Sequence, residues 1–310
     1  MLEPWNSLSL SGIRRTWWQP EVPDLPPLPM IAARGVNDGP RLLITAGVHG
    51  DEYEGPFAIH RLFERIDMTR LSGTIIGLPV VNTAAWKARA RRSPLDDVDL
   101  NRVFPGDARI GVTSALAEKV FDAFVRPCNA MIDLHSGGAA LVHLPLIGWY
   151  ASGGRDDESL ARRFDSRLNP WIIPDVPGVL SYEACRAGKR AIAAEWGGGA
   201  RLDPDGVAAY AGGLIRLLAM LGMLPEKSVD AVPIDERHPI AGDYQAAPAS
   251  GLLVPQAALG DRVVKGQSLG AIYDMLGNAV MGVHSERGGI VAGLAHRPWL
   301  NAGDRVAYVG

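Results

Sequence analysis

The chain has 310 residues, of which 47% are hydrophobic and 21% charged, the composition of a globular protein with one large domain or a large and a small one. Its 31 Lys and Arg residues nearly balance 34 Asp and Glu residues, so the net charge of −3 provides no basic field for nucleic acid. No membrane span and no signal peptide are predicted, which makes the cytoplasm the expected location.

Short apolar runs alternate with helical patterns through the first two thirds of the chain, which predicts an α/β fold with a mixed, mostly parallel sheet and flanking helices. Residues 41–46 and 74–81 are predicted central strands because they are rich in β-branched residues and bounded by Gly and Pro. Residues 130–134 and 191–194 are two further predicted strands. Two amphipathic helices are predicted from apolar residues at helical spacing, namely Ile59, Leu62, Phe63 and Ile66, and Leu116, Val120, Phe121 and Phe124.

The composition changes after residue 224. Residues 225–248 are rich in Pro and charged residues, which predicts a connection that holds at most one strand. Short β-type runs separated by glycine turns follow from Gly251 onward and predict a small, barrel-like, all-β domain. We therefore expect a catalytic α/β domain over residues 1–224, and a small β domain with its connecting segment over residues 225–310.

Two predicted strands lead into glycine-rich loops that carry candidate metal ligands. Residues 47–52 place His49 and Glu52 three positions apart, and the strand 130–134 delivers His135 into Ser-Gly-Gly. The crevice beyond the carboxyl ends of the strands is the favoured ligand site of open α/β sheets. Two imidazoles and one carboxylate are a common ligand set of catalytic zinc. Asp133 projects to the same face as His135 and is predicted to orient its ring.

Glu195 follows the strand 191–194 and precedes three glycines after Trp196. Metal-assisted amide hydrolysis needs a carboxylate that takes a proton from water and returns it to the leaving nitrogen, and Glu195 is the candidate for this general base. The alternative is an ion-paired glutamate at the edge of the sheet.

Residues 89–106 form a long polar stretch that we expect to be a binding loop. A guanidinium matches a carboxylate with two parallel hydrogen bonds, so Arg102, with Asn101 beside it, predicts an anionic substrate. The alternative is a solvated basic loop whose arginines pair with neighbouring aspartates.

Together these segments resemble the succinylglutamate desuccinylase/aspartoacylase family, zinc-dependent deacylases related to the metallocarboxypeptidases. The resemblance rests on AGVHGDE at residues 46–52, DLNR at 99–102 and DLHSGG at 133–138. It implies one zinc ion per chain bound by His49, Glu52 and His135, with Glu195 as general base. It further implies that Asn101 and Arg102 hold the substrate carboxylate and that Arg91 polarises the scissile carbonyl, with Arg92 one position away as the alternative.

Residues 91–96 and 104–106 resemble the bacterial branch of this family that includes N-acetyl-diaminobutyrate deacetylases. The C-terminal part is similar to the family's small biotinyl/lipoyl-like domain, but the hairpin at 274–278 has no lysine that could carry a cofactor. The other histidines have no matched partner in the pattern and are treated as structural or exposed, although His143 could face the cleft: His60, His143, His238, His284 and His296.

The function that follows from the resemblance is hydrolysis of a small, anionic N-acyl amino acid. A metallocarboxypeptidase or amidase that acts on peptides or cell-wall fragments is the nearest alternative, and a metal-free protein that binds a carboxylate without turnover is a third. No nucleic-acid or membrane partner is expected, and the oligomeric state stays open, a homo-oligomer included.

Overall fold

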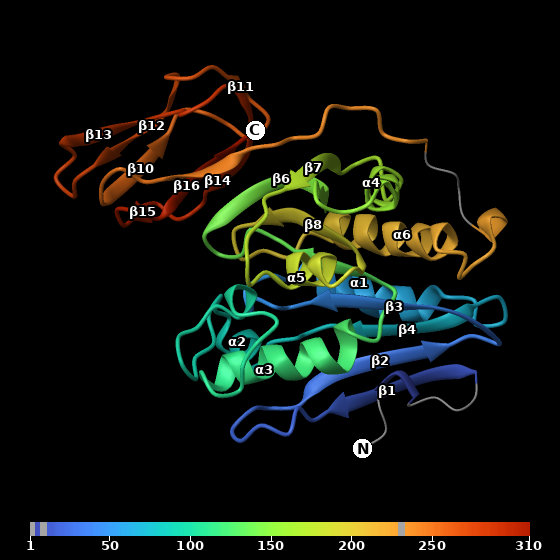
Figure 1. Cartoon of the computed structure of the whole chain (residues 1–310). Helices are drawn as coiled ribbons and strands as arrows, with labels where there is room; N and C mark the ends of the chain where they lie inside the picture. The colour runs from blue at the N-terminus through green and yellow to red at the C-terminus, as the bar shows by residue number, and fades with distance from the viewer. Residues whose placement is uncertain (1–3, 7–10, 229–232) are drawn as a thin grey trace.

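Two β-sheets run through the residues that the computed structural model describes, which are 4–6, 11–228 and 233–310 (Figure 1). Twelve described strands form the large sheet, whose main path has the order β1 (Gly12–Trp18), β2 (Leu28–Arg34), β4 (Ser72–Leu78), β3 (Asn37–Ala46), β5 (Ala130–His135), β8 (Arg190–Gly198), β6 (Leu141–Tyr150), β14 (Gly289–Ala295), β16 (Arg305–Val309) and β9 (Asp243–Ala246). In addition, β7 (Asn169–Ile173) pairs with β6, and β11 (Arg262–Val263) pairs with β14. The small sheet has the order β13 (Ala279–His284), β12 (Ser268–Tyr273), β10 (Gly251–Pro255) and β15 (Trp299–Leu300).

Among the strands that the structure describes, parallel pairing occurs in two places in the large sheet. β3 lies between β4 and β5 and is parallel to both, β8 extends this group, and β7 is parallel to β6. The flanking pairs, including β1 with β2 and β6 with β8, are antiparallel. The predicted mixed α/β sheet is therefore confirmed, but it is mostly parallel only at its centre, where long crossover connections return the chain to the same edge of the sheet.

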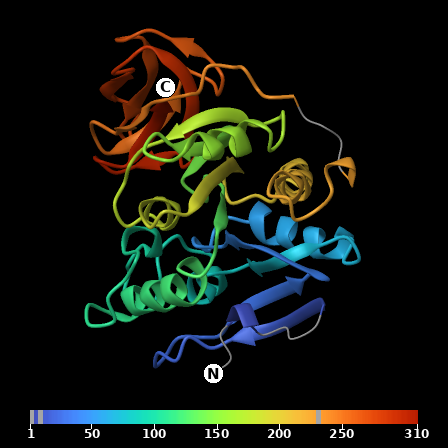
Figure 2. The same ribbon diagram turned by 45° about the vertical axis from the view of Figure 1, so that its right-hand side comes forward.

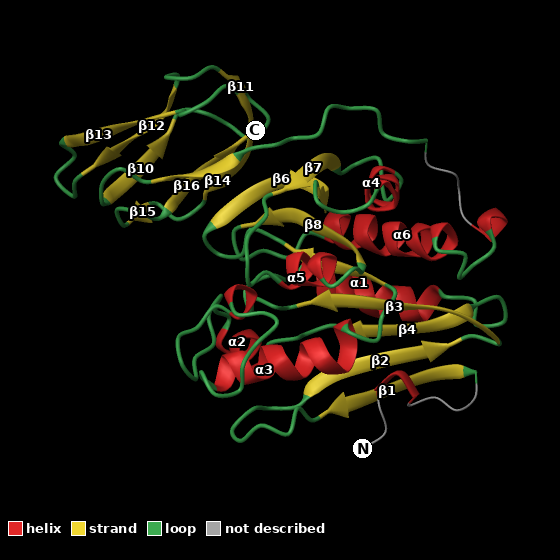
Figure 3. Cartoon of the chain, viewed as in Figure 1, coloured by secondary structure: helices red, strands yellow, loops and turns green. Residues whose placement is uncertain are grey.

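Helices cover both faces of the central strands. α1 (Glu54–Arg65) and α6 (Pro204–Met220) pack together on one face, whereas α3 (Val112–Val120) and α5 (Leu180–Arg186) lie on the other (Figures 1 and 3). Strand β3 contributes Leu42 and Ile44 to the apolar cluster under α1 and α6, and Leu43 to the cluster under α3 and α5. The alternation of side chains along a strand thus anchors β3 in two cores, which gives the loop after it a rigid base.

Both predicted amphipathic helices are confirmed, because their apolar residues are buried in these two clusters. The remaining described helical segments are α2 (Thr83–Ala88), α4 (Arg155–Arg162), the 3-10 turns Pro4–Asn6, Leu100–Arg102 and Glu226–Ser228, and the π-helical segment Phe121–Val125, which continues α3. Among the helices that the structure describes, none combines the length and apolarity needed to cross a bilayer.

The C-terminal strands continue the large sheet. β14 pairs antiparallel with β6, and β16 and β9 extend the sheet beyond it. The small sheet packs on these strands through an apolar core that includes Ile272, Val283 and Val291 (Figure 2, orange to red). In the described part of the chain neither sheet closes on itself, so the barrel-like closure expected for this region is absent there. The domain boundary after residue 224 stays a prediction, and residues 229–232 of the predicted connection lie outside the described residues.

Candidate active site

Three segments that the sequence singled out meet at one edge of the large sheet. β3, β5 and β8 are parallel neighbours, with Ala46 paired to Leu134 and His135 paired to Glu195. Parallel strands end at the same edge of a sheet, so the loop that carries His49 lies beside His135 and Glu195. The expected convergence of these residues beyond the carboxyl ends of the strands is therefore found.

Two glycines allow the loop after β3 to turn tightly against its surroundings. Gly47 adopts a φ of 58°, which is unfavourable for residues with a side chain. A Cβ atom on Gly50 would lie 2.0 Å from the backbone of Ala85, so only glycine lets the loop pack against α2. This packing sets the position of His49 and Glu52 relative to the sheet.

His49, Glu52 and His135 form a buried cluster whose candidate ligand atoms all lie within 4.8 Å of one another. Nδ1 of His49 is 2.8 Å from one carboxylate oxygen of Glu52, and Nδ1 of His135 is 2.9 Å from the other. The backbone N–H of Ser136 donates to Glu52 as well, over 3.2 Å. The three residues predicted to bind a metal thus present two imidazole nitrogens and a carboxylate to one point.

Each histidine ring is held from its far side by a second carboxylate. Nε2 of His135 lies 2.8 Å from Asp133, whose other oxygen accepts a hydrogen bond from the Thr45 hydroxyl. Nε2 of His49 lies 3.1 Å from Asp99. A carboxylate only accepts hydrogen bonds, so each ring nitrogen faces an acceptor. An ion bound at Nδ1 would take the place of the proton that faces Glu52, whereas Nε2 would remain the donor to the outer carboxylate. The predicted role of Asp133 as partner of His135 agrees with this geometry.

The charges of the cluster favour a cation at its centre. Burial opposes ionisation of Glu52, but the adjacent His49 and His135 outweigh it and hold the pKa of Glu52 well below its usual range. Burial alone would also lower the pKa of His135, yet Asp133 and Glu52 raise it well above the ordinary value. Two carboxylates thus draw positive charge to this position. A donor set of two imidazoles and one carboxylate, with both rings oriented from outside, fits a divalent transition-metal ion.

The adjacent arginines Arg91 and Arg92 have different surroundings. Arg91 donates through Nε to Asp99 over 3.0 Å, and its Nη1 lies 3.6 Å from Glu52. Arg92 donates to the backbone oxygen of Asp97, and its side chain is 59% exposed, compared with 35% for Arg91. Burial would lower the pKa of Arg91, but Asp99 and Glu52 raise it, so the guanidinium stays charged. Of the two candidates, Arg91 is the one beside the cluster.

Asn101 and Arg102 line the same cavity as the histidines. Asp99 accepts a hydrogen bond from the backbone N–H of Asn101 and so begins the helical turn Leu100–Arg102. The side-chain oxygen of Asn101 accepts from the backbone N–H of Leu180 over 2.8 Å, which leaves its amide nitrogen to donate into the cavity. Burial lowers the pKa of Arg102, and the positive charges of Arg91 and Arg305 lower it further against the opposing effect of Asp99. This crowding of cations favours an anionic ligand.

Glu195 lies within β8, which extends past it to Gly198, rather than at the end of the strand as predicted. It lines a cavity of about 230 Å³ together with His49, His135, Arg91 and Arg102. His143, which the sequence left as structural or facing the cleft, lines this cavity, as do Tyr244 and Arg305, which the sequence did not single out. Tyr244 and Arg305 belong to the C-terminal strands β9 and β16, so this region supplies part of the cavity wall.

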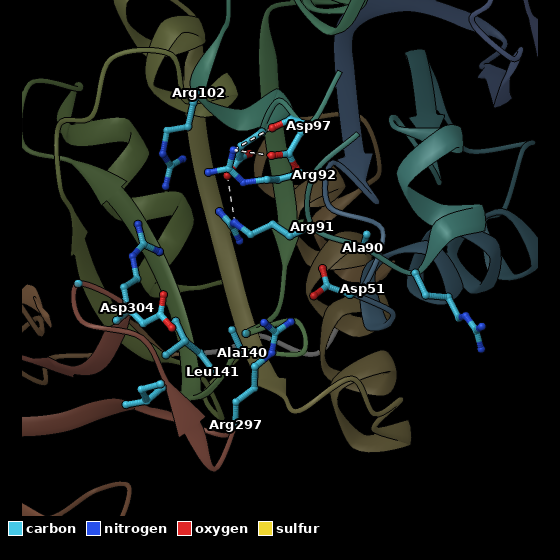
Figure 4. A pocket seen from close by; sticks show the side chains of 16 residues that line it. Asp51, Ala90, Arg91, Arg92, Asp97, Arg102, Ala140, Leu141, Arg297 and Asp304 are labelled. Carbon is cyan, nitrogen blue, oxygen red and sulfur yellow. Dashed lines mark hydrogen bonds and ion pairs between the residues drawn. The ribbon is translucent and has the colours of Figure 1, made fainter. Parts of the chain in front are cut away.

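A wider opening of about 660 Å³ adjoins this cavity and is rich in arginine. Figure 4 shows Arg91, Arg92 and Arg102 on one side of the opening, and Arg297 with Asp304 on the other. Arg91 and Arg92 pair with aspartates of their own loop. The cation-rich lining is consistent with the anionic substrate expected from the sequence.

Comparisons with known proteins agree with this geometry. Residues 38–221 match the model of the succinylglutamate desuccinylase/aspartoacylase catalytic domain. The chain is 34% identical over 285 residues to the N-alpha-acetyl-L-2,4-diaminobutyric acid deacetylase of Halomonas elongata, covering 88% of this chain and 82% of the relative. Among solved structures, it is similar to the product-bound ectoine utilization protein EutE (DoeB) of Ruegeria pomeroyi, with a TM-score of 0.87, 25% identity, and 98% of this chain and 96% of that one covered.

A succinylglutamate desuccinylase/aspartoacylase of Rhodobacter sphaeroides has a TM-score of 0.83 and 25% identity, with 96% of this chain and 95% of that one covered. The family match spans more than half of the chain and contains all three residues of the His-Glu-His cluster. The protein therefore belongs to the succinylglutamate desuccinylase/aspartoacylase family.

Proposed function

We propose that the protein is a zinc-dependent hydrolase that cleaves the amide bond of a small N-acyl amino acid, releasing a carboxylate and a free amine. The observation that carries this proposal is the convergence of His49, Glu52 and His135 on one point, beside Glu195 and Arg91 in a single cavity. The name of the Halomonas relative, an N-acetyl amino acid deacetylase, supports the same reaction class.

One zinc ion per chain would be held by Nδ1 of His49, Nδ1 of His135 and the Glu52 carboxylate. When bound, the ion supplies a Lewis acid that polarises the acyl carbonyl and acidifies water. Asp99 and Asp133 keep the proton of each ring on Nε2, which leaves both Nδ1 lone pairs available as ligands.

Glu195 acts as the general base in this proposal. Its carboxylate takes a proton from the attacking water as the carbon–oxygen bond forms, and returns it to the nitrogen as the carbon–nitrogen bond breaks. Its place beside His135 across two paired strands supports this role, because it brings the carboxylate to the edge of the ligand cluster.

Arg91 and Arg102 divide the binding of the substrate between them. Arg91 lies beside Glu52 and His49, where its guanidinium can stabilise negative charge that develops on the acyl oxygen. Arg102 and the amide nitrogen of Asn101 bind the substrate carboxylate from another side of the cavity. The cavity of about 230 Å³ suits a small substrate rather than an extended peptide.

The test combines metal analysis with release of free amine from N-acetyl, N-succinyl and N-formyl amino acids, N-alpha-acetyl-2,4-diaminobutyrate included. We expect one zinc ion per chain and amine release that a chelator abolishes and added zinc restores. Peptides with free C-termini form the comparison set. Bound zinc with cleavage of peptides alone would support the carboxypeptidase alternative, and failure to bind any metal would contradict the proposal.

A further inference from the structure

His143 connects the proposed base to the C-terminal strands. Its ring is only 3% exposed, and its Nδ1 lies 3.4 Å from Oε2 of Glu195. On the other side of the ring, Nε2 lies 3.0 Å from the hydroxyl of Tyr244. Strands β8, β6 and β9 thus supply the successive members of a Glu195–His143–Tyr244 chain.

Oε2 of Glu195 and Nδ1 of His143 are buried polar atoms that face each other. Within the described residues, neither Oε2 of Glu195 nor Nδ1 of His143 makes a hydrogen bond, although both atoms are buried. Buried polar atoms without partners are costly, and these two atoms face each other across 3.4 Å. A small change in the orientation or separation of the two side chains would be enough to form a hydrogen bond between these atoms.

Glu195 and Tyr244 together favour one tautomer of His143, because the Glu195 carboxylate opposite Nδ1 can only accept a hydrogen bond, whereas the Tyr244 hydroxyl opposite Nε2 can donate one. Burial, and then the Glu195 carboxylate, raise the pKa of Tyr244, so its hydroxyl keeps its proton and can donate. Donation to Nε2 requires a lone pair on that nitrogen and therefore places the ring proton on Nδ1, facing Glu195. The opposite tautomer would direct a lone pair at the carboxylate.

The backbone around His143 holds the ring in this position. Gly293 of β14 is paired with His143 of β6, and a Cβ atom on Gly293 would lie 2.6 Å from the imidazole. The ring therefore occupies space that any other residue at 293 would take. The register of β6 on β8 also shifts between His143 and Leu146, the residue paired with Glu195.

We propose that His143 is a positioning residue for Glu195: its Nδ1–H holds one carboxylate oxygen so that the other is directed at the reacting water, while Tyr244 helps to select the required tautomer. This proposal rests on the proposed function, in which Glu195 is the base. It also gives the C-terminal strand β9 a part in catalysis without contact with the reacting atoms.

The kinetic test compares two substitutions at His143. H143L removes the donor, and we expect kcat to fall by about 10²-fold while KM and zinc content stay unchanged, because only the orientation of the base is lost. H143N places an amide N–H near the position of Nδ1 and should recover part of the lost kcat. A normal kcat in H143L, or H143N as impaired as H143L with normal zinc content, would overturn the proposal.

A double-mutant cycle tests whether Tyr244 acts through His143. Y244F should lower kcat in the wild-type background and have no further effect in H143L. Equal losses in both backgrounds would show that Tyr244 acts independently and would overturn its assigned part.

Long-range proton–nitrogen NMR of the imidazoles tests the tautomer in the wild-type protein without any assay. We expect His143 to carry its proton on Nδ1, and a proton on Nε2 alone would overturn the proposal whatever the variants do.

The two proposals fail separately. A zinc-loaded protein that releases no amine from any N-acyl amino acid contradicts the proposed function, whereas an active enzyme with a normal H143L variant contradicts only the role of His143.

Discussion

Asp99 joins two parts of the site, because one of its carboxylate oxygens lies 3.1 Å from Nε2 of His49 and the other accepts a hydrogen bond from Arg91. Burial opposes its ionisation, but His49, Arg91 and Arg102 hold its pKa well below the usual range. One carboxylate thus orients a candidate metal ligand and the candidate oxyanion residue together.

This double role predicts the behaviour of D99N. The amide keeps the shape of the side chain but loses the charge that orients His49, so we expect zinc affinity to fall by about 10–100-fold in chelator competition. D97N is the matched control, because Asp97 lies in the same loop with its side chain 88% exposed and pairs with Arg92. Equal zinc affinity of D99N and wild type would contradict the assigned role of Asp99.

The contrast between Arg91 and Arg92 predicts unequal effects of the same substitution. R91K retains a charge but loses the planar fork beside Asp99 and Glu52, and we expect kcat to fall by about 10²–10³-fold. R92K should leave kcat unchanged, since among the described residues Arg92 is held by Asp97 of its own loop and not by the metal-ligand cluster. Steady-state kinetics on both purified variants decide the point, and impairment of R92K alone would reverse the assignment.

Arg102 is predicted to act in binding. R102A removes a charged hydrogen bond to the substrate carboxylate, which weakens binding by about 1.5–3 kcal/mol. We expect KM to rise accordingly for carboxylate-bearing substrates and to rise much less for the corresponding amides. If KM rose equally for both substrate types, recognition of the carboxylate by Arg102 would be ruled out.

Two adjacent glycines of α6 predict opposite changes in stability. A Cβ atom on Gly213 would lie 2.2 Å from the buried ring of Phe164, so G213A should lower the free energy of unfolding by about 1–3 kcal/mol. On Gly212 the nearest atoms belong to the flexible end of Arg216 at 3.4 Å, so G212A should raise that free energy by about 1 kcal/mol through helix propensity. Denaturant unfolding of both variants at equal zinc content measures the difference, and a destabilised G212A would show that its site is also closely packed.

The parts of the site that could be predicted from the sequence are those on the central parallel strands. His49, Glu52 and His135 follow directly from strand ends whose neighbours are fixed by the crossover topology, and Asp133 shares a strand face with His135. Local alternation and the ends of parallel strands are sufficient to place these side chains together.

The parts that could not be predicted depend on long-range pairing. Asp99 reaches His49 through a loop without regular periodicity. His143 and Tyr244 meet because β14 pairs with β6, β16 pairs with β14, and β9 pairs with β16. The turn spacing predicted a separate closed barrel. The described C-terminal strands β14, β16 and β9 instead extend the large sheet. Turn spacing alone does not specify which strands pair.

The most direct test of the central claim is the zinc content and turnover of E195Q. The amide fills the same volume but cannot accept a proton from water, so we expect amine release to fall by at least about 10²–10⁴-fold with one zinc ion still bound per chain. Retained zinc with lost turnover would agree with His49, Glu52 and His135 as ligands and Glu195 as base. An E195Q enzyme that turns over at the wild-type rate, or one that loses its zinc, would contradict this division of roles.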